Sequence, residues 1–220
     1  TENTFRSDNM QVKATIFKDN RLFYSLKESK FFILSAIVLI FGMLIGAMSV
    51  TALSDGVSID LSLYIKAYLA YRSDASFSKM FLTSFVSGII YILVICLSSF
   101  GVCGFPIIPL LLFFKGAVGC AVAGMLYREY SLQGIAFANL ILLPSVLVTD
   151  FILVYLSNEG LSLSRVFYGL LRDVSARGIE IRPECVRMLR ITLIAVVCIA
   201  VSAVIESAFS ACFIKYFNFS

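Results

Sequence analysis

The sequence of 220 residues contains no histidine and no tryptophan, and it has only four prolines. The absence of histidine removes the commonest metal ligand and the commonest general base at neutral pH. The six cysteines include no Cys-x-x-Cys pair, so they indicate small buried apolar side chains rather than a disulfide framework. No nucleophile–base pair stands out either. We therefore expect a protein that is not an enzyme and has no metal, no cofactor and no nucleic-acid partner.

Long apolar runs, in contrast, are abundant. Apolar residues make up 60% of the chain and the mean hydropathy is +0.93, whereas soluble domains are about 45–50% apolar. A helix needs about 20 apolar residues to cross the hydrocarbon core, and five runs meet this requirement. The sequence thus predicts an all-α integral membrane protein, a bundle of five transmembrane helices within residues 31–215, with spans at 31–53, 80–100, 105–127, 132–156 and 191–214.

The distribution of lysine and arginine predicts the orientation of this bundle. Residues 1–30 carry six of these residues and the loop 157–190 carries six more, while the segments on the opposite side carry five. Lys and Arg gather in cytoplasmic loops. We therefore expect the segment 1–30 and the loop 157–190 to be cytoplasmic, and the loop 54–79 and the C-terminus to be external.

Two connections are short and two are long. Gly104 and Pro106, in "SFGVCGFP", predict a tight turn between the second and third spans, and about four residues, "REYS", join the third and fourth. In the external loop, "LSLYIKAYLAY" predicts a short helix on the outer interface. In the cytoplasmic loop, "LSLSRVFYGLLRDV" predicts an amphipathic helix. It either lies on the inner leaflet or docks a cytoplasmic partner.

Small residues recur every four positions in two spans. The first span contains Gly42 and Gly46, and the third contains Gly116, Cys120 and Gly124. Small side chains let the backbones of membrane helices approach one another. We expect these five positions to lie at helix–helix contacts.

Three ionisable residues fall inside spans: Lys115, Asp150 and Glu206. At 1.5 Å rise per residue, Lys115 and Asp150 lie at similar depths, roughly 13 Å and 9 Å from the cytoplasmic edge, and Glu206 lies in the outer half. An ion pair between Lys115 and Asp150 would avoid two isolated charges in a low-dielectric medium. Alternatively, both side chains reach toward the interface, or Asp150 and Glu206 belong to a proton or ion path.

Three stretches resemble one known family. "FGVCGFPIIPLLLFFKGAVGCAVAGMLY" is similar to the central signature of the stage II sporulation protein M family, with its F-x-K-G step at Lys115 and Gly116. "LQGIAFANLILLP" and "AVIESAF", which contains Glu206, are similar to two further family motifs. The resemblance extends over about residues 30–215. One position departs from the family, because Ser145 follows the proline where members often carry an amide.

The resemblance implies a role in endospore formation. It implies a multi-pass protein of the bacterial inner membrane, located in the mother-cell membrane at the sporulation septum and surrounded by membrane lipids. There it would act as a non-enzymatic scaffold during forespore engulfment, holding stage II sporulation proteins D and P, which degrade peptidoglycan. A transporter or channel subunit that uses Lys115, Asp150 and Glu206 is the alternative.

Overall fold

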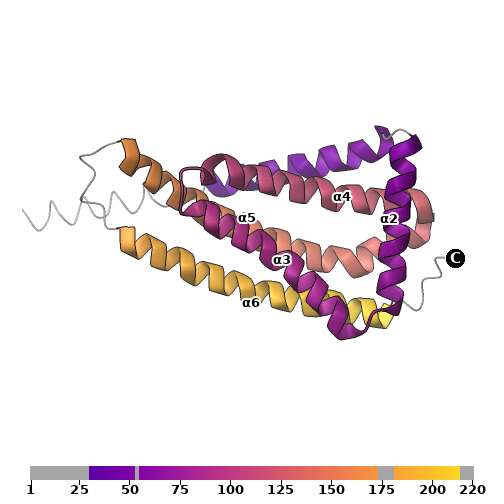
Figure 1. The fold of residues 1–220 in the computed structure, drawn as a ribbon. Helices are drawn as coiled ribbons and strands as arrows, with labels where there is room; N and C mark the ends of the chain where they lie inside the picture. The colour runs from indigo at the N-terminus through magenta and orange to yellow at the C-terminus, as the bar shows by residue number, and fades with distance from the viewer. Residues whose placement is uncertain (1–29, 53–54, 173–180, 214–220) are drawn as a thin grey trace, which may run out of the picture.

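The computed structural model describes residues 30–52, 55–172 and 181–213. In chain order these form an N-terminal helix (Lys30–Ala52), α2 (Asp55–Asp74), α3 (Phe77–Ser99), α4 (Gly104–Phe137), a π-helical turn η1 (Ala138–Leu142), α5 (Leu143–Arg172) and α6 (Ile181–Phe213). Figure 1 shows the long helices running along one axis while α2 lies across one end. The described residues contain helices and no strands, which confirms the all-α prediction.

Four of the described helices are long and apolar enough to cross a membrane: Lys30–Ala52, Phe77–Ser99, Gly104–Leu171 and Arg182–Phe213. The third has 68 residues and would measure about 100 Å if straight. Instead it reverses at Ser131, whose φ of 48° and ψ of −123° are not helical. The reversal falls within the predicted four-residue connection, and its two arms cover the predicted spans 105–127 and 132–156.

The second arm begins with two local adaptations. Gly134 packs so closely against the carbonyl oxygen of Leu126 that a Cβ atom would overlap it, which allows the chain to fold back tightly. The turn η1 follows, and in it the Leu143 N–H donates to the Ala138 carbonyl, five residues back. Pro144, the second residue of α5, has no backbone N–H to donate. The series of helical backbone hydrogen bonds therefore lacks one bond directly after η1.

Most of the predicted cytoplasmic loop 157–190 is helical. Helix α5 continues without a break to Arg172, and α6 begins at Ile181, while residues 173–180 lie outside the described residues. Leu156, Leu161 and Leu163 are buried in one core with residues of α3, α4 and α6. The amphipathic stretch is therefore helical as predicted, and it continues α5 instead of forming a separate helix.

Helix α2 was predicted as a short interfacial helix at 61–71, and it is helical over Asp55–Asp74. Ile65 and Leu69 are its buried apolar residues, and they pack with Met125, Leu126 and Phe137 at the Ser131 end of the bundle. Because α2 crosses the ends of the other helices (Figure 1), it forms a cap on this end.

The N-terminal helix packs on α4 through the predicted small residues. A Cβ atom at Gly42 or Gly46 would overlap the backbone carbonyl of Phe113 or Ala117. At Gly116 it would overlap the carbonyl of Leu39, and at Gly124 it would lie 3.2 Å from Val50. The structure thus brings glycines of both helices into one close backbone contact.

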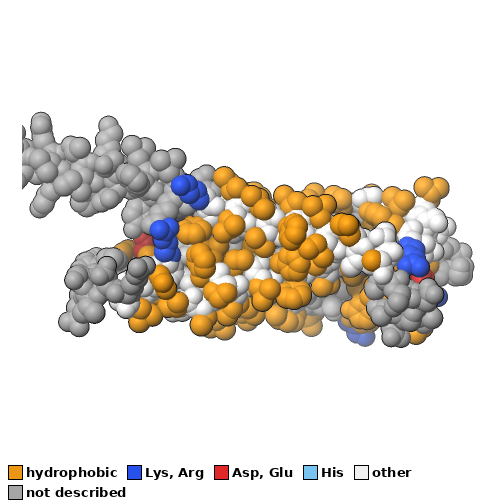
Figure 2. Space-filling model, turned by 90° about the horizontal axis from the view of Figure 1, so that it is seen from above, with side chains coloured by type: hydrophobic (Ala, Val, Ile, Leu, Met, Phe, Trp, Pro, Cys, Tyr) orange, Lys and Arg blue, Asp and Glu red, His pale blue; other side chains and the backbone are white. Residues whose placement is uncertain are grey.

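Two apolar cores are separated by a polar layer. Along α4, Ile108 and Leu112 belong to one core and Met125 and Leu126 to the other, with Lys115 between them. Along η1 and α5, the two cores contain Ile141 and Leu153, and Ser145, Thr149 and Asp150 lie between them. The outer surface is different: Figure 2 shows hydrophobic side chains over the middle of one face and basic ones near its ends. Ser145 and Asp150 are buried, so the polar layer is internal.

Candidate functional site: a buried polar layer beneath helix α2

The polar layer is built around an ion pair between Arg72 and Glu206. Arg72 lies in the last turn of α2, and its Nη2 donates a hydrogen bond to Oε1 of Glu206 on α6. The two side chains are 6% and 16% exposed. Glu206 was recognised in the sequence as an intramembrane charge, whereas Arg72 was counted among the external flanking charges. The missed signal is the spacing Ile65, Leu69, Arg72, which places Arg72 on the buried face of α2.

An aromatic ring on the same helix completes the surroundings of Arg72. The guanidinium carbon lies 5.0 Å from the centroid of the Tyr68 ring, within the range of a cation–π contact. Burial raises the pKa of the Tyr68 phenol, so the ring stays neutral beside the cation. The second guanidinium nitrogen, Nη1, is buried and has no hydrogen-bond partner among the described residues.

Ser145 links the ion pair to the fourth predicted span. Its Oγ lies 3.3 Å from Glu206 Oε2 and 3.1 Å from the Leu142 carbonyl oxygen. Ser202 Oγ donates to the Ser145 carbonyl at 2.9 Å, and Thr149 Oγ1 is 3.0 Å from Ser202 Oγ. These hydrogen bonds join α5 to α6 at the level of Glu206. Ser145, which follows Pro144, thus contacts the carboxylate of Glu206.

Lys115 and Asp150 do not form the predicted ion pair. No contact within 4.0 Å joins their charged groups among the described residues. Instead, Lys115 Nζ lies 5.1 Å from the centroid of the Tyr91 ring on α3. Asp150 is 6% exposed, and its Oδ1 has no hydrogen-bond partner among the described residues. The depth argument compared heights only, and it did not include the direction in which each side chain leaves its helix.

A cavity of about 260 Å³ adjoins these residues. Its walls include Arg72 and Tyr71 from α2, Lys115 from α4, Ser145 from α5 and Glu206 from α6. Tyr71 also reaches α3, since its hydroxyl oxygen is 3.1 Å from Thr83 Oγ1. The cavity therefore combines two cations, one carboxylate and several hydroxyl groups inside the bundle. Asp150 is not among the described residues that line it.

A second interhelical ion pair lies at the opposite end. Arg187 Nη2 on α6 donates to Glu159 Oε1 on α5 at 2.8 Å. Glu159 is buried and Arg187 is 43% exposed. Both residues were assigned to the predicted cytoplasmic loop, so the sequence analysis did not anticipate this pair. Together the two ion pairs fix α6 at both ends of the bundle.

Sequence comparison identifies the family to which the chain belongs. Residues 35–211 match the family described as stage II sporulation protein M. The chain belongs to the stage II sporulation protein M family. Comparisons with curated proteins and with solved structures gave no match. The family region includes Arg72, Lys115, Ser145 and Glu206.

In this member of the stage II sporulation protein M family, three separate motifs meet at one cavity. The F-x-K-G step contributes Lys115, the residue after the Leu-Pro step is Ser145, and the C-terminal motif contributes Glu206. One residue of each motif therefore lines the same cavity. Among the described residues, no group of three or more His, Cys, Asp or Glu side chains is arranged to hold a metal ion.

Proposed function

We propose that this protein is a five-span scaffold that holds peptidoglycan-degrading proteins at the septum during forespore engulfment. Family membership makes it a sporulation-related membrane protein. The observation that carries the proposal is the position of α2, which the Arg72–Glu206 ion pair fixes across one end of the bundle. A helix held in this way offers a preorganised surface to a partner, which lowers the entropic cost of binding.

The outward face of α2 has the character of a docking surface. Leu63 and Tyr64 are 60% and 65% exposed. Exposed apolar and aromatic side chains of this kind are typical of protein contact sites. In the proposed orientation this face is external, where stage II sporulation proteins D and P, the partners implied by the family resemblance, would act on peptidoglycan.

Each arm of the hairpin at Ser131 crosses the membrane in this proposal, which gives five spans with the N-terminus in the cytoplasm. Figure 1 shows the start of the N-terminal helix, the end of α5 and the start of α6 at the end of the bundle remote from α2. Exposed basic residues occur in these segments: Lys30, Arg165, Arg182 and Arg190. Their concentration supports a cytoplasmic position for that end. The mother-cell membrane at the septum is the proposed location.

Site-directed photo-crosslinking in sporulating cells tests the docking surface. A photoreactive amino acid at Tyr64 should crosslink to stage II sporulation protein D or P, whereas one at the inward-facing Leu69 should not. Loss of septal localisation of both partners in cells lacking the gene is the second expected result. Normal engulfment and normal localisation without the protein would rule out the scaffold.

The alternative function is transport through the polar cavity. The presence of Lys115 and Glu206 in its walls favours this reading, because intramembrane charges often line ion pathways. Solute or proton flux into proteoliposomes, abolished by Glu206→Gln, would support transport. Equal flux in protein-containing and protein-free vesicles would leave the scaffold as the only function of the two.

A further inference from the structure

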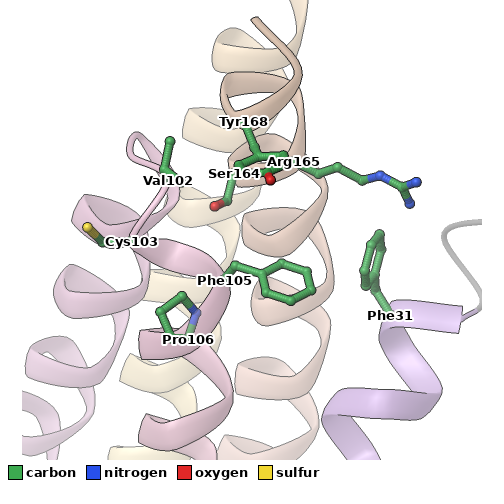
Figure 3. A pocket seen from close by; sticks show the side chains of 8 residues that line it. All are labelled: Phe31, Val102, Cys103, Phe105, Pro106, Ser164, Arg165 and Tyr168. Carbon is green, nitrogen blue, oxygen red and sulfur yellow. The ribbon is translucent and has the colours of Figure 1, made fainter. Parts of the chain in front are cut away.

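A groove lies at the end of the bundle remote from α2. It has a volume of about 760 Å³, within the usual range for ligand sites. Figure 3 shows its walls: Phe31 from the N-terminal helix, the α3–α4 turn with Val102, the start of α4 with Phe105, and Arg165 and Tyr168 from α5. Four segments distant in sequence therefore form one groove.

The walls are apolar and aromatic, with one cation at the rim. In Figure 3 the ring of Phe105 points toward Phe31, and Arg165 extends from α5 above both rings. The guanidinium carbon of Arg165 is 5.8 Å from the centroid of the Phe31 ring. No carboxylate within 4.0 Å pairs with Arg165 in the part of the chain that the structure describes. Arg165 is exposed, so its charge is available to a ligand.

The floor of the groove is fixed by the α3–α4 turn. Ser164 Oγ donates to the Gly101 carbonyl at 2.8 Å, and the Gly104 N–H donates to the same carbonyl at 3.3 Å. Helix α4 begins at Gly104, and the positive end of its dipole faces this end of the bundle, which favours a nearby anion. These hydrogen bonds hold the α3–α4 turn against α5.

The groove lies where the apolar surface of the bundle meets its basic end. Lys30, Arg182 and Arg190 are exposed at the same end as Arg165. Apolar side chains such as Leu97 and Leu110 are exposed further along α3 and α4. A ligand that fits this boundary has an anionic group near Arg165 and an apolar chain between the phenylalanine rings. Phospholipids with a net negative charge have both parts, and basic residues at the membrane surface attract them.

We propose that this groove binds one molecule of anionic phospholipid, with its phosphate on Arg165 and an acyl chain against Phe31 and Phe105. The inference does not depend on the proposed septal partners, because it concerns the opposite end of the bundle. Binding there would tie the N-terminal helix to the α3–α4 turn and to α5.

Because the sequence contains no tryptophan, a tryptophan introduced into the groove can report lipid binding there by its fluorescence. Phe105→Trp introduces a single fluorophore into the groove of the full chain, which is then reconstituted in phosphatidylcholine vesicles. Phosphatidylglycerol with brominated acyl chains should quench this tryptophan at a lower mole fraction than brominated phosphatidylcholine does. A control tryptophan at Leu97, which is 72% exposed on α3, should be quenched equally by both lipids.

Two arginine variants distinguish specific lipid binding in the groove from a general attraction of anionic lipid to the basic end of the bundle. In the Phe105→Trp background, Arg165→Gln should weaken the preference for phosphatidylglycerol roughly tenfold, as expected for one charge-assisted hydrogen bond. Arg182→Gln removes the same charge at the same end but outside the groove, and it should leave the preference unchanged. Equal losses in the two variants would overturn the proposal.

The remaining outcomes are also decisive. Equal quenching by both lipids would show that the groove does not select anionic lipid, and quenching by neither would show that another part of the chain fills it. Inorganic phosphate should not reverse the quenching, and reversal would identify a free-anion site instead. If Phe105→Trp does not fold, Tyr168→Trp places the fluorophore on the opposite wall, and the same results decide the proposal.

Discussion

Arg72 of α2 and Glu206 of α6 form a largely buried ion pair across 134 positions of sequence. The pair connects a helix that caps the bundle to a helix that crosses it, and it lies between the two apolar cores. Since both side chains are largely removed from solvent, the energetic consequence of losing one partner differs from that of losing both. This difference makes the pair testable.

Removal of either partner alone should destabilise the bundle strongly. Arg72→Met leaves the Glu206 carboxylate buried without its cation, and Glu206→Leu leaves the guanidinium buried without its anion, each at a cost of about 3–5 kcal/mol. The double variant Arg72→Met with Glu206→Leu should be more stable than either single variant. Reversible denaturation in mixed micelles, analysed as a double-mutant cycle, measures the coupling.

Lys66→Met provides the matched control for this cycle, because Lys66 is an exposed cation on the same helix. Its effect on the free energy of unfolding should stay within about 0.5 kcal/mol. Additive effects of the Arg72 and Glu206 substitutions would mean that the ion pair does not stabilise the position of α2.

An asparagine side chain should be tolerated in place of Ser145. Ser145→Ala removes the hydroxyl that lies 3.3 Å from Glu206 Oε2, and the expected loss in the free energy of unfolding is about 1 kcal/mol. Ser145→Asn supplies an N–H donor to the same carboxylate, and the adjoining cavity has room for the longer side chain. The same denaturation assay should therefore rank asparagine at least level with serine and above alanine. An asparagine variant less stable than the alanine variant would contradict this role.

The sequence was sufficient for those features that depend on length and local chemistry. Apolar runs located the helices, and Gly104 and the "REYS" segment located the two tight turns. The end of α5 was missed because Arg165 and Arg172 marked residues 157–172 as a loop. Leu156, Leu161 and Leu163 nevertheless extend the buried face beyond the length needed to cross a membrane.

The polar layer was only partly predictable for a different reason. Intramembrane position alone singled out Lys115, Asp150 and Glu206, but partner choice depends on the rotation of each helix and on the direction of each side chain. Arg72 was hidden because the lysines and arginines outside the predicted spans were used as topological markers. Its spacing from Ile65 and Leu69 on α2 would have placed it on the buried face.

The glycine contact between the N-terminal helix and α4 should tolerate no larger side chain. A Cβ atom at Gly46 would overlap the Ala117 backbone, so Gly46→Ala must displace one helix, at a cost of about 1–3 kcal/mol. At Gly119, also on α4, a Cβ atom would meet no described atom within 4 Å, and Gly119→Ala should be neutral or slightly stabilising because alanine favours the helix. Thermal unfolding in detergent compares the two. Equal effects at the two positions would contradict the packing of these helices.

Lys115 should couple to Tyr91 more strongly than to Asp150. Its Nζ lies 5.1 Å from the Tyr91 ring centroid, and a cation–π contact of this kind contributes about 0.5–2 kcal/mol. A double-mutant cycle of Lys115→Met with Tyr91→Leu should therefore show a coupling energy in that range. The cycle of Lys115→Met with Asp150→Asn should give a smaller value, since no contact within 4.0 Å joins the two charged groups. The reverse order of coupling would restore the direct Lys115–Asp150 ion pair as the arrangement in the membrane, with the lysine side chain turned from α3 toward α5.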